Sequence, residues 1–551
     1  MTYRIARSSF SGIVKPFVMA TRSPTISLKI SEDADTVFNS SLSPTSTAEG
    51  DNISGVPLVS DLELNNRRHS EGDSRLRAAS SASKLDCRGT TVDDLPDELM
   101  LEIFSYVSFS ENIKVLQNVC TRWRILAQDA HLWLHEKYIV RQETSEEEAI
   151  ATFSAVPQLR TVILEKEVSP GVFQALSRSC PHLTTLEINF WQMLTCLEAD
   201  NLFAGCRKIH TLSISDKGIR ANVRFLDAVA RLADLRVLHI QETEDADKVI
   251  PLRIIADGCP HLSDLRLGDV FGLCYQYQDA EYFISSHKCV LKSLRIRWTS
   301  VKGRSIVPLL LVCADMLEHL ELINHHEVSV EEATKTLTAL GKLHNLRRLH
   351  FGVTNREVRH LVPAVFENGR LQKLQHLQLS CMVQDETVRA VAQHCPDLRE
   401  LELLSCAGHT DALFEPLHRL KKLETLKIAY CPCLGGKAIS YIAQVSALHT
   451  LEFSSVKFYK LKPSVDCILE MSELRRLFLK YCICWAIPFD KFPGRLVNLR
   501  ELEIDYCDGD QDVLDRISAQ MPDLRVEGTL GAQITDDSYD EYEYYEEGNS
   551  E

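Results

Sequence analysis

Apolar residues recur in a single pattern from residue 159 almost to the end of the chain. The pattern is L-x-x-L-x-L, and a degenerate last copy starts at Leu524. The other copies begin at Leu159, Leu183, Ile209, Leu235, Leu262, Leu291, Leu317, Leu346, Leu374, Leu398, Leu423, Leu448, Leu474 and Leu499. Within each copy the L-x-L part alternates apolar and polar positions, which predicts a short strand with one buried face.

The copies lie about 26 residues apart, and the residues between them favour a returning helix, for example over 333–340 and 386–394. One such strand–helix unit cannot bury its apolar side alone, whereas a stack of units forms a continuous core. The period and pattern are typical of leucine-rich repeats. We therefore expect an α/β solenoid of about 14–15 repeats over residues 159–530. It should be curved, with parallel strands on the concave face and helices on the convex face.

A different pattern precedes the repeats, over residues 91–138. Leu99, Ile103 and Val107 recur every four positions, and Pro96 suits the first turn of a helix. A second amphipathic stretch contains Val115, Leu116, Val119, Trp123 and Leu126. We expect a small all-α module of three short helices. Because so short a module buries little surface alone, it should expose apolar side chains to a partner and pack against the first repeats.

Residues 95–133 begin L-P-D-E-L and continue through V-C-T-R-W to a final tryptophan. This segment resembles the F-box, a three-helix module that binds the Skp adaptor of cullin–RING ubiquitin ligases. The resemblance implies an adaptor-binding surface that includes Leu95, Pro96, Leu99, Ile103, Phe104, Val119, Cys120 and Trp123. The last three should divide between that surface and the core of the module. Residues 108–118 are about one residue longer than the family pattern. A simple cap on the solenoid is the alternative, but a cap requires neither the L-P-x-E-L start nor the V-C-x-x-W motif.

Cysteines follow several strands at a constant offset of three positions, as at Cys406, Cys431, Cys482 and Cys507. These spacings resemble the cysteine-containing subclass of leucine-rich repeats, which is common in F-box proteins. The combined resemblance implies the substrate-recognition subunit of an SCF-type ubiquitin ligase, which would reach cullin and RING subunits through the Skp adaptor. The alternative is an F-box/repeat scaffold that recruits partners without directing their ubiquitylation.

The remaining segments are predicted from composition. Residues 1–90 are rich in serine and threonine and should be disordered. Residues 139–158 should form a helical connector, with Ser145 before three glutamates as its start. Residues 531–551 should be a disordered acidic tail, since 536–551 hold eight acids and no base.

Charge and cysteine usage narrow the choice of partners and compartment. A net charge of −16 argues against nucleic acid, and the longest apolar stretch is about half of what a membrane span requires. Eighteen cysteines without a secretory signal indicate a reducing compartment, the cytoplasm, the nucleus or both.

The sequence suggests neither a metal site nor a catalytic one. Cys431 and Cys433 would need to share a zinc ion with Cys482 and Cys484, two repeats away. Stacked strands place these pairs roughly 10 Å apart, whereas each sulfur must lie about 2.3 Å from zinc. Cys431 and Cys482 are better interpreted as small buried residues. Nothing beside any cysteine suggests activation by a base, so we expect no cofactor and no enzymatic activity in this chain.

The variable positions beside the strand leucines should line the concave face and bind substrate. The candidate residues in the middle repeats are basic or aromatic: Arg266, Arg295, Arg297, Trp298, Arg348, His350 and His376. Two interpretations remain open. The arginines could bind an acidic or phosphorylated protein segment, or a small anion. Alternatively, they could pair locally, Arg266 with Asp264 and Arg348 with Glu321.

Overall fold

A computed structural model describes residues 92, 95–189, 194–214, 223–240, 249–267, 274–275, 277–297, 305–323, 329–353, 356–380, 383–404, 411–431, 434–462 and 464–532. The segment 1–90, predicted to be disordered, lies outside these residues. So does nearly all of the predicted acidic tail.

Short helices make up the N-terminal module. They are α1 (Asp97–Ser105), α2 (Phe109–Glu111), the π-helix η2 (Asn112–Leu116), α3 (Gln117–Val119), α4 (Thr121–Ala127) and α5 (Ala130–Trp133). Their small core contains Met100, Phe104, Leu116, Leu126 and Ala127. The π-helical turn η2 falls in the segment that is longer than the family pattern, and one added residue is what a π-turn absorbs.

Sixteen parallel strands form one sheet, in an order that follows the chain. The strands are β1 (Lys137–Val140), β2 (Thr161–Leu164), β3 (Thr185–Ile188), β4 (Thr211–Ile214), β5 (Val237–Ile240), β7 (Asp264–Leu267), β9 (Ser293–Arg297), β10 (His319–Ile323), β11 (Arg348–Gly352), β12 (His376–Ser380), β13 (Glu400–Leu404), β14 (Thr425–Ala429), β15 (Thr450–Ser454), β16 (Arg476–Lys480), β17 (Glu501–Cys507) and β18 (Arg525–Leu530). A separate two-stranded sheet pairs β6 (Val249–Ile250) with β8 (Cys274–Tyr275).

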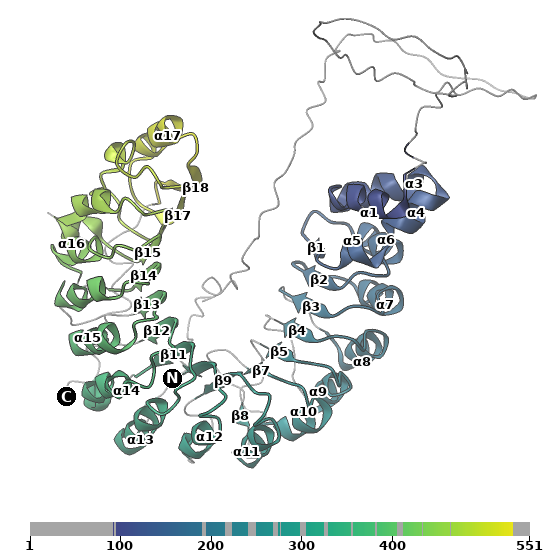
Figure 1. Ribbon diagram of the computed structural model, residues 1–551, viewed down its shortest axis with the longest axis horizontal. Helices are drawn as coiled ribbons and strands as arrows, with labels where there is room; N and C mark the ends of the chain where they lie inside the picture. The colour runs from purple at the N-terminus through teal and green to yellow at the C-terminus, as the bar shows by residue number, and fades with distance from the viewer. Residues whose placement is uncertain are drawn as a thin grey trace, which may run out of the picture. The chain divides into compact units, whose positions relative to one another are not determined.

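Helices return the chain between successive strands. The α-helices are α6 (Glu146–Ala155), α7 (Pro170–Ser179), α8 (Cys196–Gly205), α9 (Val223–Val229), α10 (Leu252–Gly258), α11 (Tyr277–Ser286), α12 (Val307–Val312), α13 (Val330–Leu340), α14 (Pro363–Glu367), α15 (Asp385–His394), α16 (Ala438–Ile442) and α17 (Gln511–Gln520). The 3-10 helices are η3 (Arg356–Leu361), η4 (Asp411–Leu413), η5 (Glu415–Arg419), η6 (Phe458–Leu461), η7 (Ser464–Glu470) and η8 (Phe489–Lys491). The sheet is curved, with strands on its inner side and helices on its outer side (Figure 1), which confirms the predicted solenoid.

The repeat pattern and the buried core coincide. In β13, Leu401 and Leu403 are buried while Glu400 and Glu402 are only half-buried, and β3, β4, β5 and β12 alternate in the same way. The leucines and isoleucines that open the copies are buried too, from Leu159 to Leu524. No helix in the described ranges is long and apolar enough to cross a membrane.

The predicted helical connector is more than a helix. Its first residues belong to β1, which pairs in parallel with β2, so the sheet begins at Lys137 rather than at residue 159. Helix α6 follows, and the Ser145 hydroxyl accepts a hydrogen bond from the Glu148 N–H, as the serine–glutamate sequence predicted. Residues 137–155 are therefore a complete strand–helix unit whose strand lacks the L-x-L motif.

Candidate functional site

Helix α1 presents an apolar stripe to solvent. Leu99 is 52% exposed and Ile103, one turn later, is 46% exposed. Seven of the eighteen large hydrophobic side chains exposed in the described part of the chain lie between Val92 and Ile125. Since apolar patches on a small module usually mark a protein interaction site, this stripe is the candidate adaptor-binding surface.

One predicted member of that surface lies elsewhere. Phe104 is only 2% exposed and packs in the core of the module, so it cannot offer a surface to the adaptor in this conformation. Helix α1 carries two apolar stripes: Met100 and Phe104 face inward, and Leu99 and Ile103 face outward. Every-fourth-residue spacing fits both stripes equally well, and only the packing of the neighbouring helices distinguishes them.

Helix α4, which contains the end of the V-C-x-x-W motif, contacts the start of α1 through Arg122. The Arg122 guanidinium donates hydrogen bonds to the Asp97 carboxylate, at 2.7 and 3.0 Å, and to the backbone carbonyl of Leu95. Leu95 is half-buried, whereas Pro96 before the helix is exposed. This contact brings the start of α4 beside the start of α1.

Val119, Cys120 and Trp123 divide between surface and core. Val119 and Cys120 are exposed, and Trp123 is half-buried against Phe104. Cys120 also has a structural role, because its extended backbone ends α3 and its sulfur accepts the Trp123 N–H at the start of α4.

An aromatic chain connects the module to the first repeats. Phe109 packs edge to face on Trp133 and stacks on Tyr138 of β1, with ring centroids 5.2 and 5.3 Å apart respectively. Tyr138 in turn packs edge to face on Phe153 of α6. The Gln128 side chain donates to the Ala155 carbonyl at 3.1 Å across the same junction. The module is thus fixed to the solenoid by buried contacts rather than joined through a loose linker.

On the central concave face, charged side chains of the same and of neighbouring strands form ion pairs with one another. Arg266 lies 3.3 Å from Asp264 and 3.5 Å from Glu321, and Arg295 also pairs with Glu321. His239 Nε2 lies 3.2 Å from Asp264 Oδ2. Although burial opposes it, the hydrogen bond from His239 and the charge of Arg266 hold the pKa of Asp264 well below its ordinary value. Likewise, Arg295 and Arg266 lower the pKa of Glu321 against the effect of burial.

These contacts favour local pairing over a free anion-binding patch. The expected Arg266–Asp264 pair forms, but Glu321 pairs with Arg266 and Arg295 instead of Arg348. Strand register explains the difference: Glu321 is aligned with Arg295 and His350, while Arg348 is aligned with His319. Arg348 itself is exposed, and its positive charge contributes, after burial, to lowering the pKa of His319.

The other predicted substrate-binding residues are not all brought together. His350 Nε2 lies 3.3 Å from the Ser380 hydroxyl, and His376 Nδ1 lies 2.8 Å from the Glu400 carboxylate. Arg297 lies in β9, but its side chain falls outside the described set, as does Trp298 altogether.

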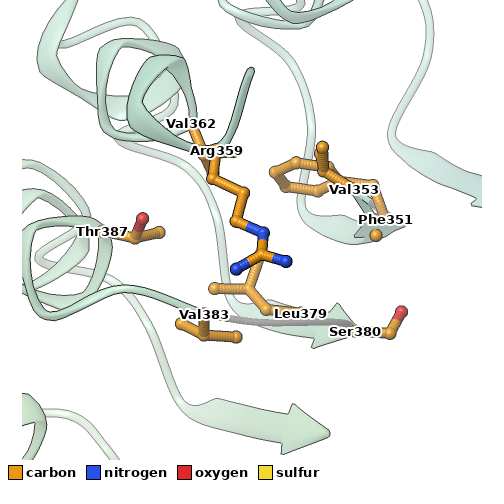
Figure 2. A pocket seen from close by; sticks show the side chains of 9 residues that line it. Phe351, Val353, Arg359, Val362, Leu379, Ser380, Val383 and Thr387 are labelled. Carbon is orange, nitrogen blue, oxygen red and sulfur yellow. The ribbon is translucent and has the colours of Figure 1, made fainter. Parts of the chain in front are cut away.

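A small pocket lies beside this face, between β11, β12, η3 and α15. Figure 2 shows the Arg359 side chain pointing into it among Phe351, Val353, Leu379 and Val383. Its volume is about 20 Å³, which holds about one water molecule. The pocket is therefore too small for an organic anion in this conformation.

The repeat cysteines serve packing. Cys482 and Cys507 are fully buried, and their thiols donate to the carbonyls of Phe453 and Leu479 at 3.5 and 3.3 Å. Cys431 is buried too, with its thiol 3.4 Å from the Ala429 carbonyl, as the sequence predicted; Cys433 and Cys406 lie outside the described residues. Over the described ranges, no group of three or more His, Cys, Asp or Glu side chains is arranged to hold a metal ion.

Sequence reasoning predicted that the module packs against the first repeats but did not identify the residues of that junction, and it missed the Glu321 pairs. Only the Glu321 pairs leave a trace in the sequence. Aligning the central positions of successive L-x-L motifs would have set Arg295 against Glu321. The aromatic residues Phe109, Trp133, Tyr138 and Phe153 carried no comparable signal, since their contacts depend on how the module docks.

Comparisons with known proteins agree with this architecture. Residues 92–135 match the F-box-like family. F-box/LRR-repeat protein 12 of Mus musculus is 31% identical over 115 residues, and F-box DNA helicase 1 of Gallus gallus is 27% identical over 121 residues. The matched parts cover 17% and 21% of this chain but only 32% and 11% of those proteins. A solved complex of Rad7 and Elc1 in yeast contains a chain that is 14% identical, with a TM-score of 0.33; the match covers 80% of this chain and 90% of that one. The chain thus carries an F-box-like module followed by leucine-rich repeats, as F-box/LRR-repeat proteins do.

Proposed function

We propose that this F-box/leucine-rich-repeat chain is the substrate-recognition subunit of an SCF-type ubiquitin ligase. Its F-box-like module binds a Skp-type adaptor, which links it to the cullin and RING subunits. The repeats bind a protein substrate, and the chain itself performs no chemistry. The observation that carries the proposal is the exposed Leu99–Ile103 stripe on a module that matches the F-box-like family.

The buried junction supports this role. A ligase must hold its substrate at a defined position relative to the ubiquitin-carrying enzyme, and proximity of this kind requires a rigid connection. The aromatic contacts from Phe109 through Tyr138 to Phe153 provide one between the module and the repeats. A reducing compartment, the cytoplasm or the nucleus, fits the thirteen cysteines whose side chains the structure describes, which are all free.

The junction also determines how the proposal is best tested. Deleting residues 92–138 would remove Trp133 and part of β1 and expose the first repeats. The double substitution Leu99→Glu/Ile103→Glu is better suited, because both side chains are already exposed and the fold should survive. We expect it to abolish co-purification with adaptor and cullin under proteasome inhibition, and to lengthen the half-lives of captured substrates.

Leu197→Glu is the matched control, since Leu197 is an exposed leucine on α8, outside the module. It should leave adaptor binding and substrate half-lives unchanged. If the double variant still binds the adaptor as the unsubstituted chain does, the assignment of this surface is wrong. If the unsubstituted chain binds adaptor without cullin, and substrate half-lives do not change, the chain is a scaffold.

A further inference from the structure

Exposed aromatic side chains gather on the last repeats. Of the six exposed tyrosine and tryptophan side chains in the described ranges, four lie between residues 459 and 506. They are Tyr459, Tyr481, Trp485 and Tyr506, which together we call the C-terminal aromatic surface. Exposed aromatic clusters are unusual outside binding sites, because tyrosine and tryptophan dominate the energetics of protein interfaces.

Two of these rings are held in register. Tyr481 and Tyr506 stack with ring centroids 5.4 Å apart and planes within 2° of parallel, yet they stay 43% and 65% exposed. Both residues adopt left-handed backbone conformations, with φ values of 52° and 48°. The Tyr481 N–H donates to the Asp505 carbonyl at 2.8 Å, which anchors the unusual turn to β17. The ring faces are thus presented by fixed backbone rather than by a loose loop.

The other two rings occupy equivalent positions on neighbouring repeats. Lys457, Ile483 and Asp508 form isolated parallel bridges that extend the pairing beyond the strands. Tyr459 and Trp485 each follow a bridged residue by two positions, so they lie on the same edge of adjacent repeats. The aromatic surface therefore spans the repeats that contain β15, β16 and β17.

Carboxylates lie near the stacked Tyr481 and Tyr506 rings, whereas Tyr459 has Lys457 and Lys460 beside it in sequence. Lys480 forms an ion pair with Glu452, at 2.8 Å, and Arg525 forms one with Glu527. Glu501, Glu503 and Asp505 on β17 form no ion pair within the described part of the chain. Burial, together with the nearby Glu527, Glu452 and Glu501, raises the pKa of Glu503 even though Lys480 opposes the shift. Unlike the central concave face, strands β15 to β18 carry more carboxylates than basic side chains.

We propose that the C-terminal aromatic surface docks a basic, Lys/Arg-containing segment of a partner protein. Ammonium and guanidinium groups bind over tyrosine and tryptophan faces through cation–π attraction. They also form charge-assisted hydrogen bonds with carboxylates such as Glu503 and Asp505. A second copy of this chain is a poorer occupant because the net charge of −16 would oppose its approach. The acidic segment 536–551 is disfavoured for the same reason. The inference rests on the proposed function, in which this segment would belong to the substrate.

The test is direct binding to the purified full-length chain, measured by fluorescence anisotropy with a labelled Arg-Gly-Ser repeat peptide. A Glu-Gly-Ser repeat peptide of equal length serves as the opposite probe. We expect the basic peptide to bind, the acidic one not to bind, and affinity to fall as salt is raised. The double variant Tyr481→Ala/Tyr506→Ala should weaken binding about tenfold or more, and Glu503→Gln should weaken it by a smaller factor.

Two matched controls isolate the surface. Tyr282→Ala removes an exposed tyrosine from α11, and Glu187→Gln removes a carboxylate from the same sheet row on β3. Neither should change the affinity, and equal losses in these controls would overturn the proposal. So would equal binding of the two peptides, or self-association of the chain that Tyr481→Ala/Tyr506→Ala abolishes. The Leu99→Glu/Ile103→Glu variant should bind the basic peptide normally, so failure of this inference is distinguishable from failure of adaptor binding.

Discussion

The indole of Trp123 packs edge to face against the ring of Phe104, with ring centroids 5.2 Å apart and planes at 61°. This contact joins α4 to α1 at the centre of a core with only five buried apolar residues. In so small a core each large side chain carries a large share of the stability. The exposed stripe of α1, Leu99 and Ile103, is held in position by the packing of the buried stripe, Met100 and Phe104.

Phe104→Ala should therefore destabilise the module by about 3–5 kcal/mol, the usual cost of deleting a buried phenylalanine. Hydrogen exchange should accelerate across residues 95–133 while the repeats stay protected. Ile103→Ala, next in sequence but exposed, is the control and should change exchange little. Equal effects of the two substitutions would mean that the inward and outward stripes have been assigned wrongly.

Glu400 gives the concave face a pH dependence. The hydrogen bond from His376, followed by the charge of Lys427, holds the pKa of Glu400 at about 2, below its ordinary 4.5, although burial opposes the shift. Because the folded pKa is the lower one, the stabilisation is complete above about pH 4.5 and is lost as the pH falls toward 2. Its upper limit is about 3 kcal/mol, reduced by partial exposure of the carboxylate.

Glu400→Gln should consequently lower the free energy of unfolding at pH 7, measured with urea, and the deficit should shrink as the pH falls below 4.5. Glu424→Gln is the matched control, because the Glu424 carboxylate is only partly buried and pairs with the exposed Arg399. Its effect should be small and independent of pH. A deficit for Glu400→Gln that stayed constant down to pH 3 would contradict the assignment.

The last strand depends on one glycine. Gly528 of β18 has a φ of +87°, and a Cβ there would lie 1.6 Å from the Ile504 carbonyl oxygen of β17. Gly528→Ala should detach β18 and expose β17 to hydrogen exchange. Gly494→Ala is the control: Gly494 has a similar φ of +80°, but nothing lies within 4 Å of its Cβ position. It should incur only the conformational penalty, about 1–2 kcal/mol.

The repeat cysteines should resist modification in the folded chain. Burial raises the pKa of Cys180, Cys206, Cys259, Cys313 and Cys395 to about 12. At neutral pH these thiols are protonated as well as inaccessible, and the thiolate is the reactive form. Alkylation followed residue by residue with mass spectrometry should label the exposed Cys120 and Cys289 first. Rapid labelling of the five buried thiols without denaturant would show that the repeats open readily.

Periodicity in the sequence was sufficient to predict the repeats and the existence of the helical module. An L-x-L strand buries the same side wherever it occurs, and Leu401 and Leu403 are buried for a reason that is local to β13. The Ser145 cap and the resemblance to the F-box are equally local, because each depends on residues within a few turns of one another. These features needed no knowledge of what packs against them.

Tertiary structure decided everything that depends on a neighbour distant in sequence. It alone placed Phe104 inside and Ile103 outside, since two helical stripes with the same spacing differ only in what covers them. It alone showed that Glu321 forms an ion pair with Arg295 rather than with Arg348. Ion pairs between neighbouring strands follow the strand register, and the loops between strands differ in length. It also made residues 137–155 the first unit of the sheet. The sequence by itself thus determined which elements form and which face of each strand is buried, while the surfaces available to partners emerged only from packing between elements about one repeat apart.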